Sequence, residues 1–183
     1  MEKPSCAARE KAVRSFPPVS APDARLLILG SMPGRASLAA VQYYAHPRNA
    51  FWSIMEEILA LPPAMAYEER LSALKDRRIA LWDVLASCVR PGSLDSDIEV
   101  PSIIPNDFVS FFANHPLIQT VFFNGTMAEQ SWKRHVLPTL PPELRPKTCI
   151  RLPSTSPAHA GRTLREKIEA WRIVEHTLGE VEK

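Results

Sequence analysis

The sequence predicts an α/β fold, a three-layer α/β/α sandwich with a central four-stranded parallel sheet. Two observations carry this prediction: four short apolar runs recur along the chain, and segments with a helical spacing of apolar residues separate them. Short continuous apolar runs are typical of strands buried on both faces. Because alternating strands and helices connect through right-handed crossovers, the strands should be parallel and helices should cover both faces of the sheet.

The four predicted strands share one character. The first is a continuous apolar run that ends at Gly30, and the other three resemble it; the segments are residues 25–30, 79–84, 120–123 and 148–152. We expect all four to be buried, and with them the small side chains of Cys88 and Cys149.

Helical spacing predicts helices over residues 51–59, 67–78 and 107–114, with Asn106 as the expected cap of the third. Thr126–Glu129 and Thr163–Glu166 both have the form of a capping box, which predicts a helix start at each. The last helix has the clearest pattern, and Gly179 is its expected end. Its apolar stripe consists of Leu164, Ile168, Trp171, Val174 and Leu178.

We expect one domain over residues 25–183, preceded by a poorly ordered N-terminal tail. The tail, residues 1–24, is polar and contains four prolines. Inside the domain, residues 84–106 show little periodicity and are interrupted by prolines. Long stretches of this kind in a compact domain are usually functional loops, although a short helix in this stretch is an alternative.

Composition excludes several classes of protein. The chain has 183 residues, of which 45% are hydrophobic, and a formal net charge of +2, so it is not a disordered chain. It contains 18 prolines and only 6 glycines, which excludes collagen-like and glycine-linker sequences. Proline fixes φ, so the loops should be stiff.

The chain offers no pattern typical of a metal site. Its three cysteines are far apart, and its five histidines lack metal-ligand spacing. No apolar run approaches the roughly 18 residues that a membrane span requires, and the first residues contain no apolar signal-peptide core. We therefore expect no metal site and no membrane contact. A monomer without a cofactor is a separate expectation. The expected location is cytoplasmic, and nucleoid-associated if the protein is bacterial.

Polar residues follow each predicted strand, where ligands bind in open α/β sheets. Gly30 and Ser31 lie at the end of the first strand, Asp83 near the end of the second, and Asn124 directly after the third. The fourth strand leads into Pro153-Ser154-Thr155-Ser156-Pro157-Ala158-His159. Because parallel strands end at one edge, these groups should converge there. Dinucleotide, Walker and nucleophile-elbow motifs are all missing, which argues against those chemistries.

The motifs at these strand ends resemble a known family. Gly30-Ser31-Met32-Pro33-Gly34, followed by Tyr44-Ala45-His46-Pro47-Arg48-Asn49 and Phe51-Trp52, is similar to the first motif of the uracil-DNA glycosylase superfamily, and residues 152–160 resemble its second motif. The combination most resembles the hypoxanthine-DNA (deoxyinosine) glycosylases and covers about residues 25–175. The resemblance implies a four-stranded parallel sheet and base-excision repair of DNA that contains a deaminated base.

The resemblance also implies residue roles. The mismatch-specific branch holds its catalytic water with an asparagine where this chain has Met32, so the role moves to Asn49, as in the hypoxanthine branch. His159 is the second catalytic candidate, because an anionic leaving base needs nearby donors. The implied substrate-binding residues are Gly30, Ser31, Tyr44, Asp83 and Asn124, with Tyr44 stacking on a flipped base. Phosphate contacts are expected from Arg48, Ser154, Ser156 and Arg162, with Arg90 a further candidate.

Each of these residues also has a purely structural interpretation. Asn49 could cap a helix, Asp83 could cap a turn, Asn124 could occupy a left-handed turn position, and the arginines could be solvated. At the level of function, uracil- or mismatch-directed excision, a non-catalytic damaged-DNA-binding protein and an enzyme for free nucleosides remain alternatives. No lysine lies in the motifs, so no Schiff-base lyase step is expected.

Overall fold

The computed structural model describes residues 12–92 and 94–181. Its centre is a four-stranded parallel sheet in the order β3-β2-β6-β7, as predicted. The strands are β2 (Leu26–Gly30), β3 (Ile79–Asp83), β6 (Thr120–Asn124) and β7 (Thr148–Leu152). Their register places Gly30 beside Asp83 and Asn124 beside Leu152, so the carboxyl ends of all four strands lie at one edge.

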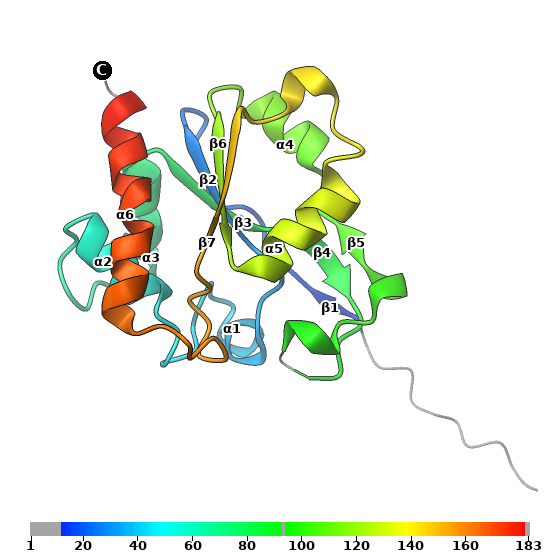
Figure 1. Ribbon diagram of the computed structural model, residues 1–183, viewed down its shortest axis with the longest axis horizontal. Helices are drawn as coiled ribbons and strands as arrows, with labels where there is room; N and C mark the ends of the chain where they lie inside the picture. The colour runs from blue at the N-terminus through cyan, green and yellow to red at the C-terminus, as the bar shows by residue number, and fades with distance from the viewer. Residues whose placement is uncertain (1–11, 93, 182–183) are drawn as a thin grey trace, which may run out of the picture.

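Helices cover both faces of this sheet (Figure 1). One face carries α2 (Phe51–Ile58), α3 (Tyr67–Asp76) and α6 (Leu164–Val181), and the other carries α4 (Phe108–Asn114) and α5 (Thr126–Ser131). A short helix, α1 (Arg35–Ala40), follows β2, and two further turns of helix are η3 (Trp132–Val136) and η4 (Pro142–Leu144). The predicted three-layer sandwich is confirmed. No helix of the described segments is long and apolar enough to cross a membrane.

A second, small antiparallel sheet forms where residues 84–106 meet the N-terminal segment. Its strands are β1 (Val13–Arg14), β4 (Leu85–Cys88) and β5 (Ile104–Pro105), in the order β1-β4-β5. Two 3-10 turns, η1 (Asp95–Asp97) and η2 (Val100–Ser102), lie between β4 and β5. Strands this short carry no periodicity, so their pairing depends on partners distant in sequence.

The prediction of a poorly ordered tail over residues 1–24 has a different outcome for its two parts. Residues 1–11 lie outside the described residues. Residues 12–24 are not a free tail, because β1 pairs with β4, and Val19 exchanges backbone hydrogen bonds with Leu81 at 2.9 and 2.8 Å. The prolines in this segment suit an edge strand, in which one side needs no donors.

Strand β7 departs from the prediction of four buried strands. It pairs only with β6, and Thr148, Cys149 and Arg151 are exposed. As the edge strand it is open to solvent, so the prediction that Cys149 is buried was wrong, whereas Cys88 is buried. The apolar run alone could not distinguish an edge strand from a central one.

The helix ends confirm one predicted cap and correct three. In α6, the Thr163 hydroxyl and the Glu166 carboxylate form the predicted capping box. The cap of α4 is Asp107, which accepts from the Ser110 amide at 3.0 Å, rather than Asn106. Gly125 precedes α5 without a side-chain cap, and α6 continues past Gly179. Tertiary packing outweighs these weak local signals.

Candidate active site

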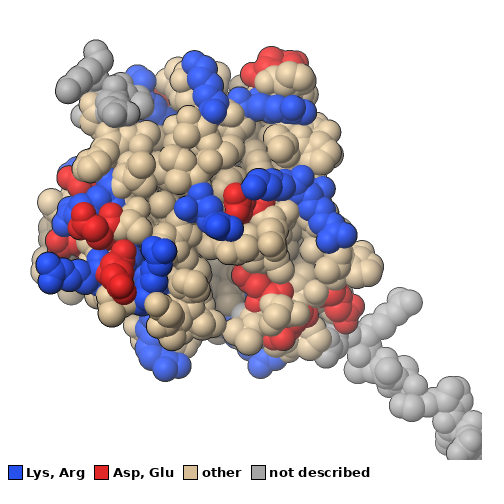
Figure 2. All heavy atoms as spheres, viewed as in Figure 1, with Lys and Arg blue, Asp and Glu red and all other residues tan. Residues whose placement is uncertain are grey.

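A cleft of about 1280 Å³ lies at the carboxyl ends of the four parallel strands. Arg90, the further phosphate candidate, does not line it, but the other eleven residues that the sequence singled out for the site do; they are Gly30, Ser31, Tyr44, Arg48, Asn49, Asp83, Asn124, Ser154, Ser156, His159 and Arg162. Figure 2 shows a hollow in this part of the molecule, with Lys and Arg on one side and a group of acidic side chains on the other. The topology therefore brings both motifs to one cavity.

Asp83 and Gly30 meet at the floor of the cleft. An added Cβ on Gly30 would lie 2.3 Å from Oδ1 of Asp83 and 2.9 Å from the hydroxyl of Tyr44. Any side chain at position 30 would therefore displace the carboxylate. The glycine is needed here because its lack of a side chain lets the Asp83 carboxylate reach across the end of β2.

The Asp83 carboxylate is only 3% exposed. Burial, together with the nearby charge of Asp95, raises its pKa to about 7. The Ser15 hydroxyl, which donates to Oδ2 at 2.9 Å, and the positive charge of Arg90 oppose this rise. Such a carboxylate changes charge near neutral pH, a property common at functional sites.

A second carboxylate supports the first motif. The Ser31 hydroxyl lies 2.8 Å from both carboxylate oxygens of Asp95, which comes from η1. Burial raises the pKa of Asp95. Sequence analysis missed Asp95, because the segment around it had no pattern to place it beside the first strand.

Arg90 lies inside the protein rather than on its surface. It is 5% exposed and donates to the carbonyl of Pro33, within the first motif. In the described part of the chain, its Nε and Nη1 have no hydrogen-bond partner. Arg90 therefore cannot contact phosphate as the sequence had suggested; its charge instead acts on Asp83 and Asp95.

Tyr44 has a left-handed backbone conformation, with φ of 55°. Its ring stacks on Phe51 with centroids 4.0 Å apart, so one of its two faces is already covered. Its hydroxyl is buried and has no hydrogen-bond partner among the described residues. Desolvation and the charge of Asp83 raise the pKa of this hydroxyl well above its usual range, so it stays protonated.

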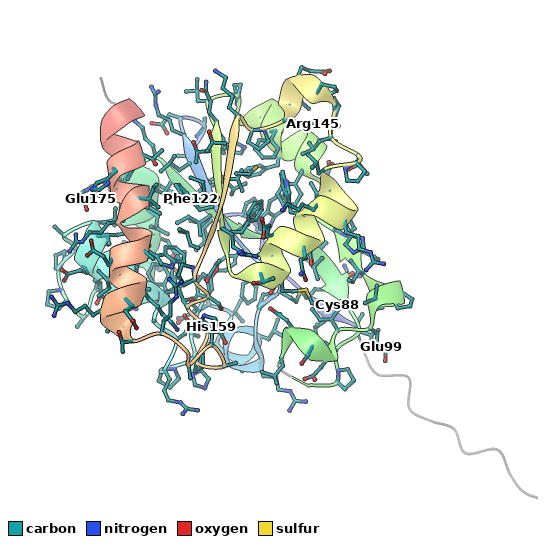
Figure 3. The ribbon with its side chains drawn as sticks, in the orientation of Figure 1. Cys88, Glu99, Phe122, Arg145, His159 and Glu175 are labelled. Atoms are coloured by element: carbon teal, nitrogen blue, oxygen red, sulfur yellow. The ribbon has the colours of Figure 1, made fainter. Side chains whose placement is uncertain are left out.

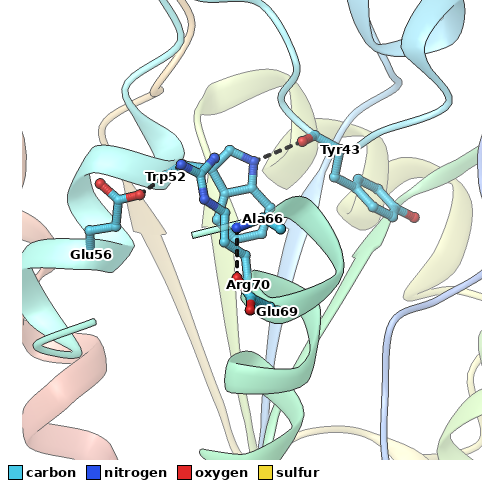
Figure 4. A network of polar contacts seen from close by, with 6 residues as sticks. All are labelled: Tyr43, Trp52, Glu56, Ala66, Glu69 and Arg70. Atoms are coloured by element: carbon cyan, nitrogen blue, oxygen red, sulfur yellow. Dashed lines mark hydrogen bonds and ion pairs between the residues drawn. The ribbon is translucent and has the colours of Figure 1, made fainter. Parts of the chain in front are cut away.

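A polar network fixes the loop that carries Tyr44 (Figure 4). The indole N–H of Trp52 donates to the carbonyl of Tyr43 at 2.9 Å, and the Tyr43 amide donates to the hydroxyl of Tyr67 at 2.9 Å. The Arg70 guanidinium lies over the Trp52 ring at 5.5 Å and pairs with Glu56 at 2.8 Å. Side chains of helices α2 and α3 thus fix the position of this loop.

Asn49 lies just before α2. Its Oδ1 accepts a hydrogen bond from the Phe51 amide, the first amide of α2, at 3.0 Å. The N-cap residue itself is Ala50, so Asn49 caps the helix from one residue outside it. The next residue, Ala50, donates its amide to the carbonyl of Thr155 at 3.0 Å, which ties the first motif to the second. Asn49 is partly exposed and lines the cleft, so the capping bond orients its amide there.

Asn124 forms a two-point clamp with Thr155. Its Nδ2 donates to the Thr155 hydroxyl at 2.8 Å, and its Oδ1 accepts from the Thr155 amide at 2.9 Å. Thr155 is 1% exposed and was not singled out from the sequence, although it lies between two serines that were. The clamp fixes the second motif against the end of β6.

Hydrogen bonds between serine hydroxyl oxygens and backbone amides stabilise the turns of the loop after β7. Ser154 Oγ accepts from the Ser156 amide, and Ser156 Oγ accepts from the Ala158 amide, both at 3.2 Å. His159 is exposed at the cleft rim; Figure 3 labels it in the loop between β7 and α6. Lys167 donates to the carbonyl of His159 at 2.9 Å and so anchors the end of the loop to α6.

Arg48 and Arg162 are exposed at the cleft, as phosphate-binding side chains must be. Arg151 also lines the cleft and pairs with Glu129 at 3.1 Å. No cluster of three potential metal ligands occurs in residues 12–92 and 94–181. The arrangement offers hydroxyl, amide and backbone donors around a partly apolar cavity, which suits recognition of a planar polar ring.

The chain is similar to DNA glycosylases in sequence and structure. A family model for the Uracil DNA glycosylase superfamily matches residues 17–175. Two proteins named Hypoxanthine DNA glycosylase are similar: one from Methanosarcina barkeri, 39% identical over 61% of this chain and 70% of its own, and one from Methanosarcina acetivorans, 40% identical over 63% and 72%. The solution NMR structure of a candidate uracil DNA glycosylase from Methanosarcina acetivorans superimposes with a TM-score of 0.75 at 33% identity, covering 92% of this chain and 99% of that one.

The family match covers most of the chain, and the parallel sheet, the two motifs and the shared cleft agree with it. The protein belongs to the uracil DNA glycosylase superfamily and is an enzyme that hydrolyses N-glycosyl bonds in DNA.

Proposed function

We propose that the enzyme is a monofunctional DNA glycosylase that removes a deaminated base, hypoxanthine, from DNA. The observation that carries this proposal is the convergence of both motifs on one cleft, in a chain about 40% identical to relatives named for that activity. Inside a duplex the glycosidic bond is inaccessible, so the target nucleotide must rotate out of the stack into the cleft.

Asn49 positions the attacking water in this mechanism. A carbonyl oxygen has two lone pairs, and the Phe51 amide occupies only one of those on Oδ1. The second lone pair can accept from a water molecule beneath C1′ of the sugar. The structural and catalytic interpretations of Asn49 are therefore compatible, because the capping bond fixes the side chain that holds the water.

The leaving base is stabilised by donors from the loop after β7. Cleavage of an N-glycosidic bond makes the sugar oxocarbenium-like and the base anionic. An amide is a weak base, so donors aimed at the departing base must supply much of the rate. His159 at the rim is the candidate for this role, together with the backbone amides of its loop.

Tyr44 and Asp83 bind the flipped base. Phe51 covers one face of the Tyr44 ring, which leaves the other face for stacking. Hypoxanthine carries an N1–H donor, and an ionised Asp83 can accept it. Thr155 takes one bond from each group of the Asn124 amide, which leaves one N–H and one lone pair for the edge of the base. Arg48, Arg162, Ser154 and Ser156 contact the phosphates on either side.

A panel of duplexes tests the function directly. Hypoxanthine, uracil, xanthine or a thymine mismatch is placed at one site, the duplex is incubated with the enzyme, and alkali then breaks the strand at each abasic site. We expect breaks at hypoxanthine. Breaks at uracil alone would favour the uracil-directed alternative, and salt-sensitive binding without breaks would favour a non-catalytic protein. Turnover of free inosine would favour a nucleoside enzyme instead.

A further inference from the structure

Strand β1 and the residues that follow it form a clasp, residues 13–19, that reaches the floor of the cleft. Val13 and Arg14 pair with β4, and the Ser15 amide donates to the carbonyl of Ala86 at 2.9 Å. Beyond Ser15, the Phe16 carbonyl accepts from the indole of Trp82 at 3.0 Å. Ser15 is therefore held on both sides by ordered backbone.

The clasp also contacts the residue beside Tyr44. The Tyr43 hydroxyl lies 3.4 Å from the Phe16 carbonyl and 3.2 Å from that of Pro17, and the Phe16 and Tyr43 rings meet edge to face at 5.2 Å. The clasp thus connects the first motif with the end of β3. Nothing in the sequence pattern of residues 13–19 suggested such a role.

Ser15 is the one side-chain donor to the Asp83 carboxylate among the described residues. It binds Oδ2, whereas Oδ1 lies against Gly30 at the floor of the cleft. No salt bridge to Asp83 occurs in the described part of the chain. A buried carboxylate held by a single hydroxyl depends on that hydroxyl for its orientation and for its charge.

We propose that Ser15 is a positioning residue, which fixes the ionised Asp83 carboxylate with one oxygen bound to the clasp and the other presented to the base. This inference rests on the proposed function, because it assigns Asp83 the N1–H of the flipped base. It makes the N-terminal segment part of the recognition site.

Charged and titratable side chains from several elements surround the Asp83 carboxylate. Ser15 and Arg90 favour the charged form, whereas burial and Asp95 disfavour it, and both Tyr43 and Tyr44 lie close enough to interact with its charge. These opposing effects leave the pKa of Asp83 at about 7. The Ser15 hydrogen bond lowers the pKa of Asp83, whereas burial raises it. Without the hydroxyl the pKa should rise, so the carboxylate takes up a proton at a higher pH.

The test compares Ser15→Ala and Ser15→Thr with the wild-type enzyme. Single-turnover excision of hypoxanthine is measured from pH 5.5 to 9.5, and the titration of the Asp83 carboxyl carbon is followed by ¹³C NMR. For Ser15→Ala we expect both midpoints to move to higher pH. A shift of about one pH unit would lower excision near pH 7 by about fivefold and leave it unchanged above the new midpoint.

Ser15→Thr keeps the hydroxyl and should restore both midpoints, which a loss of packing alone would not explain. Ser110→Ala is the matched control, since Ser110, on the exposed face of α4, also donates to a carboxylate, that of Asp107 at 2.6 Å, and the change should leave both curves unchanged. An Asp83 titration that is the same in Ser15→Ala and wild type overturns the inference. If the wild type releases no hypoxanthine, the proposed function fails, and the NMR titration still decides whether Ser15 sets the charge of Asp83.

Discussion

At the scale of single residues, the site depends on polar side chains that combine a structural hydrogen bond with an atom free to contact the substrate. Asn49 both caps α2 and faces the cleft, and Asp83 is a buried carboxylate without an ion-pair partner among the described residues. In each side chain one hydrogen bond fixes the orientation, and a remaining lone pair or oxygen atom is free to bind water or the base. The structural and the chemical roles can therefore be separated by choosing substitutions that keep one and remove the other.

Asn49→Ala should abolish both roles, whereas Asn49→Ser should keep the cap. Loss of the cap costs about 1 kcal/mol of unfolding free energy, and serine restores most of this. Excision should fall by about 100-fold or more in both variants, because neither side chain holds water as the amide does. Urea unfolding and single-turnover kinetics measure the two effects. Full activity in Asn49→Ala would remove the residue from the mechanism; Asn114→Ala, on α4, is the control.

The charge of Asp83 predicts a stability effect with a definite sign. Its folded pKa of about 7 exceeds the 3.8 of an aspartate in water, so between these values the folded state binds more protons than the unfolded state. The free energy of unfolding should therefore fall as pH rises from about 4 to 7, by up to about 4 kcal/mol from this group. In Asp83→Asn this fall should vanish. Urea unfolding at pH 4.5 and 8 measures it, and equal pH dependence in both proteins would contradict it.

At the scale of elements, the close approach of two loops limits which residues can stand between them. Gly125 joins β6 to α5 with φ of 96°, and the Cβ of Ser154 lies 2.9 Å from where a Cβ of residue 125 would be. The Asn124–Thr155 clamp lies immediately beside this contact. The turn after β6 therefore sets the position of the whole second motif.

Glycine-to-alanine changes at two positions should have opposite signs. Gly125→Ala forces a left-handed backbone on alanine and pushes Ser154 away, so we expect a loss of about 1–3 kcal/mol and reduced excision. Gly179→Ala, inside α6 with no atom near the added carbon, should gain about 0.5–1 kcal/mol. Thermal unfolding of both variants measures this pair. A stable, fully active Gly125→Ala would show that the turn tolerates a side chain.

At the scale of the whole molecule, the near-neutral net charge leaves DNA affinity to local charge at the cleft. Arg48 and Arg162 lie on the rim, whereas Arg172 lies on α6 in ion pairs with Glu57, Glu169 and Glu175. Acidic residues on the opposite side of the hollow restrict where phosphates can lie (Figure 2). Binding should therefore depend on a few arginines rather than on a broad basic surface.

Arg48→Ala and Arg162→Ala should each weaken DNA binding and reduce its salt dependence. Each phosphate contact contributes about 0.9 to the slope of log K against log salt concentration, so each variant should lower the slope by about one. Arg172→Ala should leave the slope unchanged. Fluorescence anisotropy of a labelled duplex from 50 to 300 mM salt measures the slope for each variant. An unchanged slope in both rim variants would remove these arginines from the phosphate contacts.

Local sequence patterns were sufficient for the parallel sheet and for the strand ends that carry the site. The apolar runs of β2, β3 and β6 indicated strands because burial on both faces favours apolar residues, whereas β7 proved to be an exposed edge strand. Since all parallel strands end at one edge, the polar residues after each strand had to converge. The motifs at those ends then suggested the superfamily that the comparisons establish.

Tertiary structure alone decided what surrounds that site. Two-residue strands such as β1 and β5 have no local signal, because they form only where a distant segment offers unpaired backbone groups. For the same reason no local pattern indicates that Ser15 contacts Asp83, that Arg90 is buried or that Thr155 clamps Asn124. Periodicity records which side of an element is apolar, whereas pairing, edge position and burial depend on which elements meet in the folded chain.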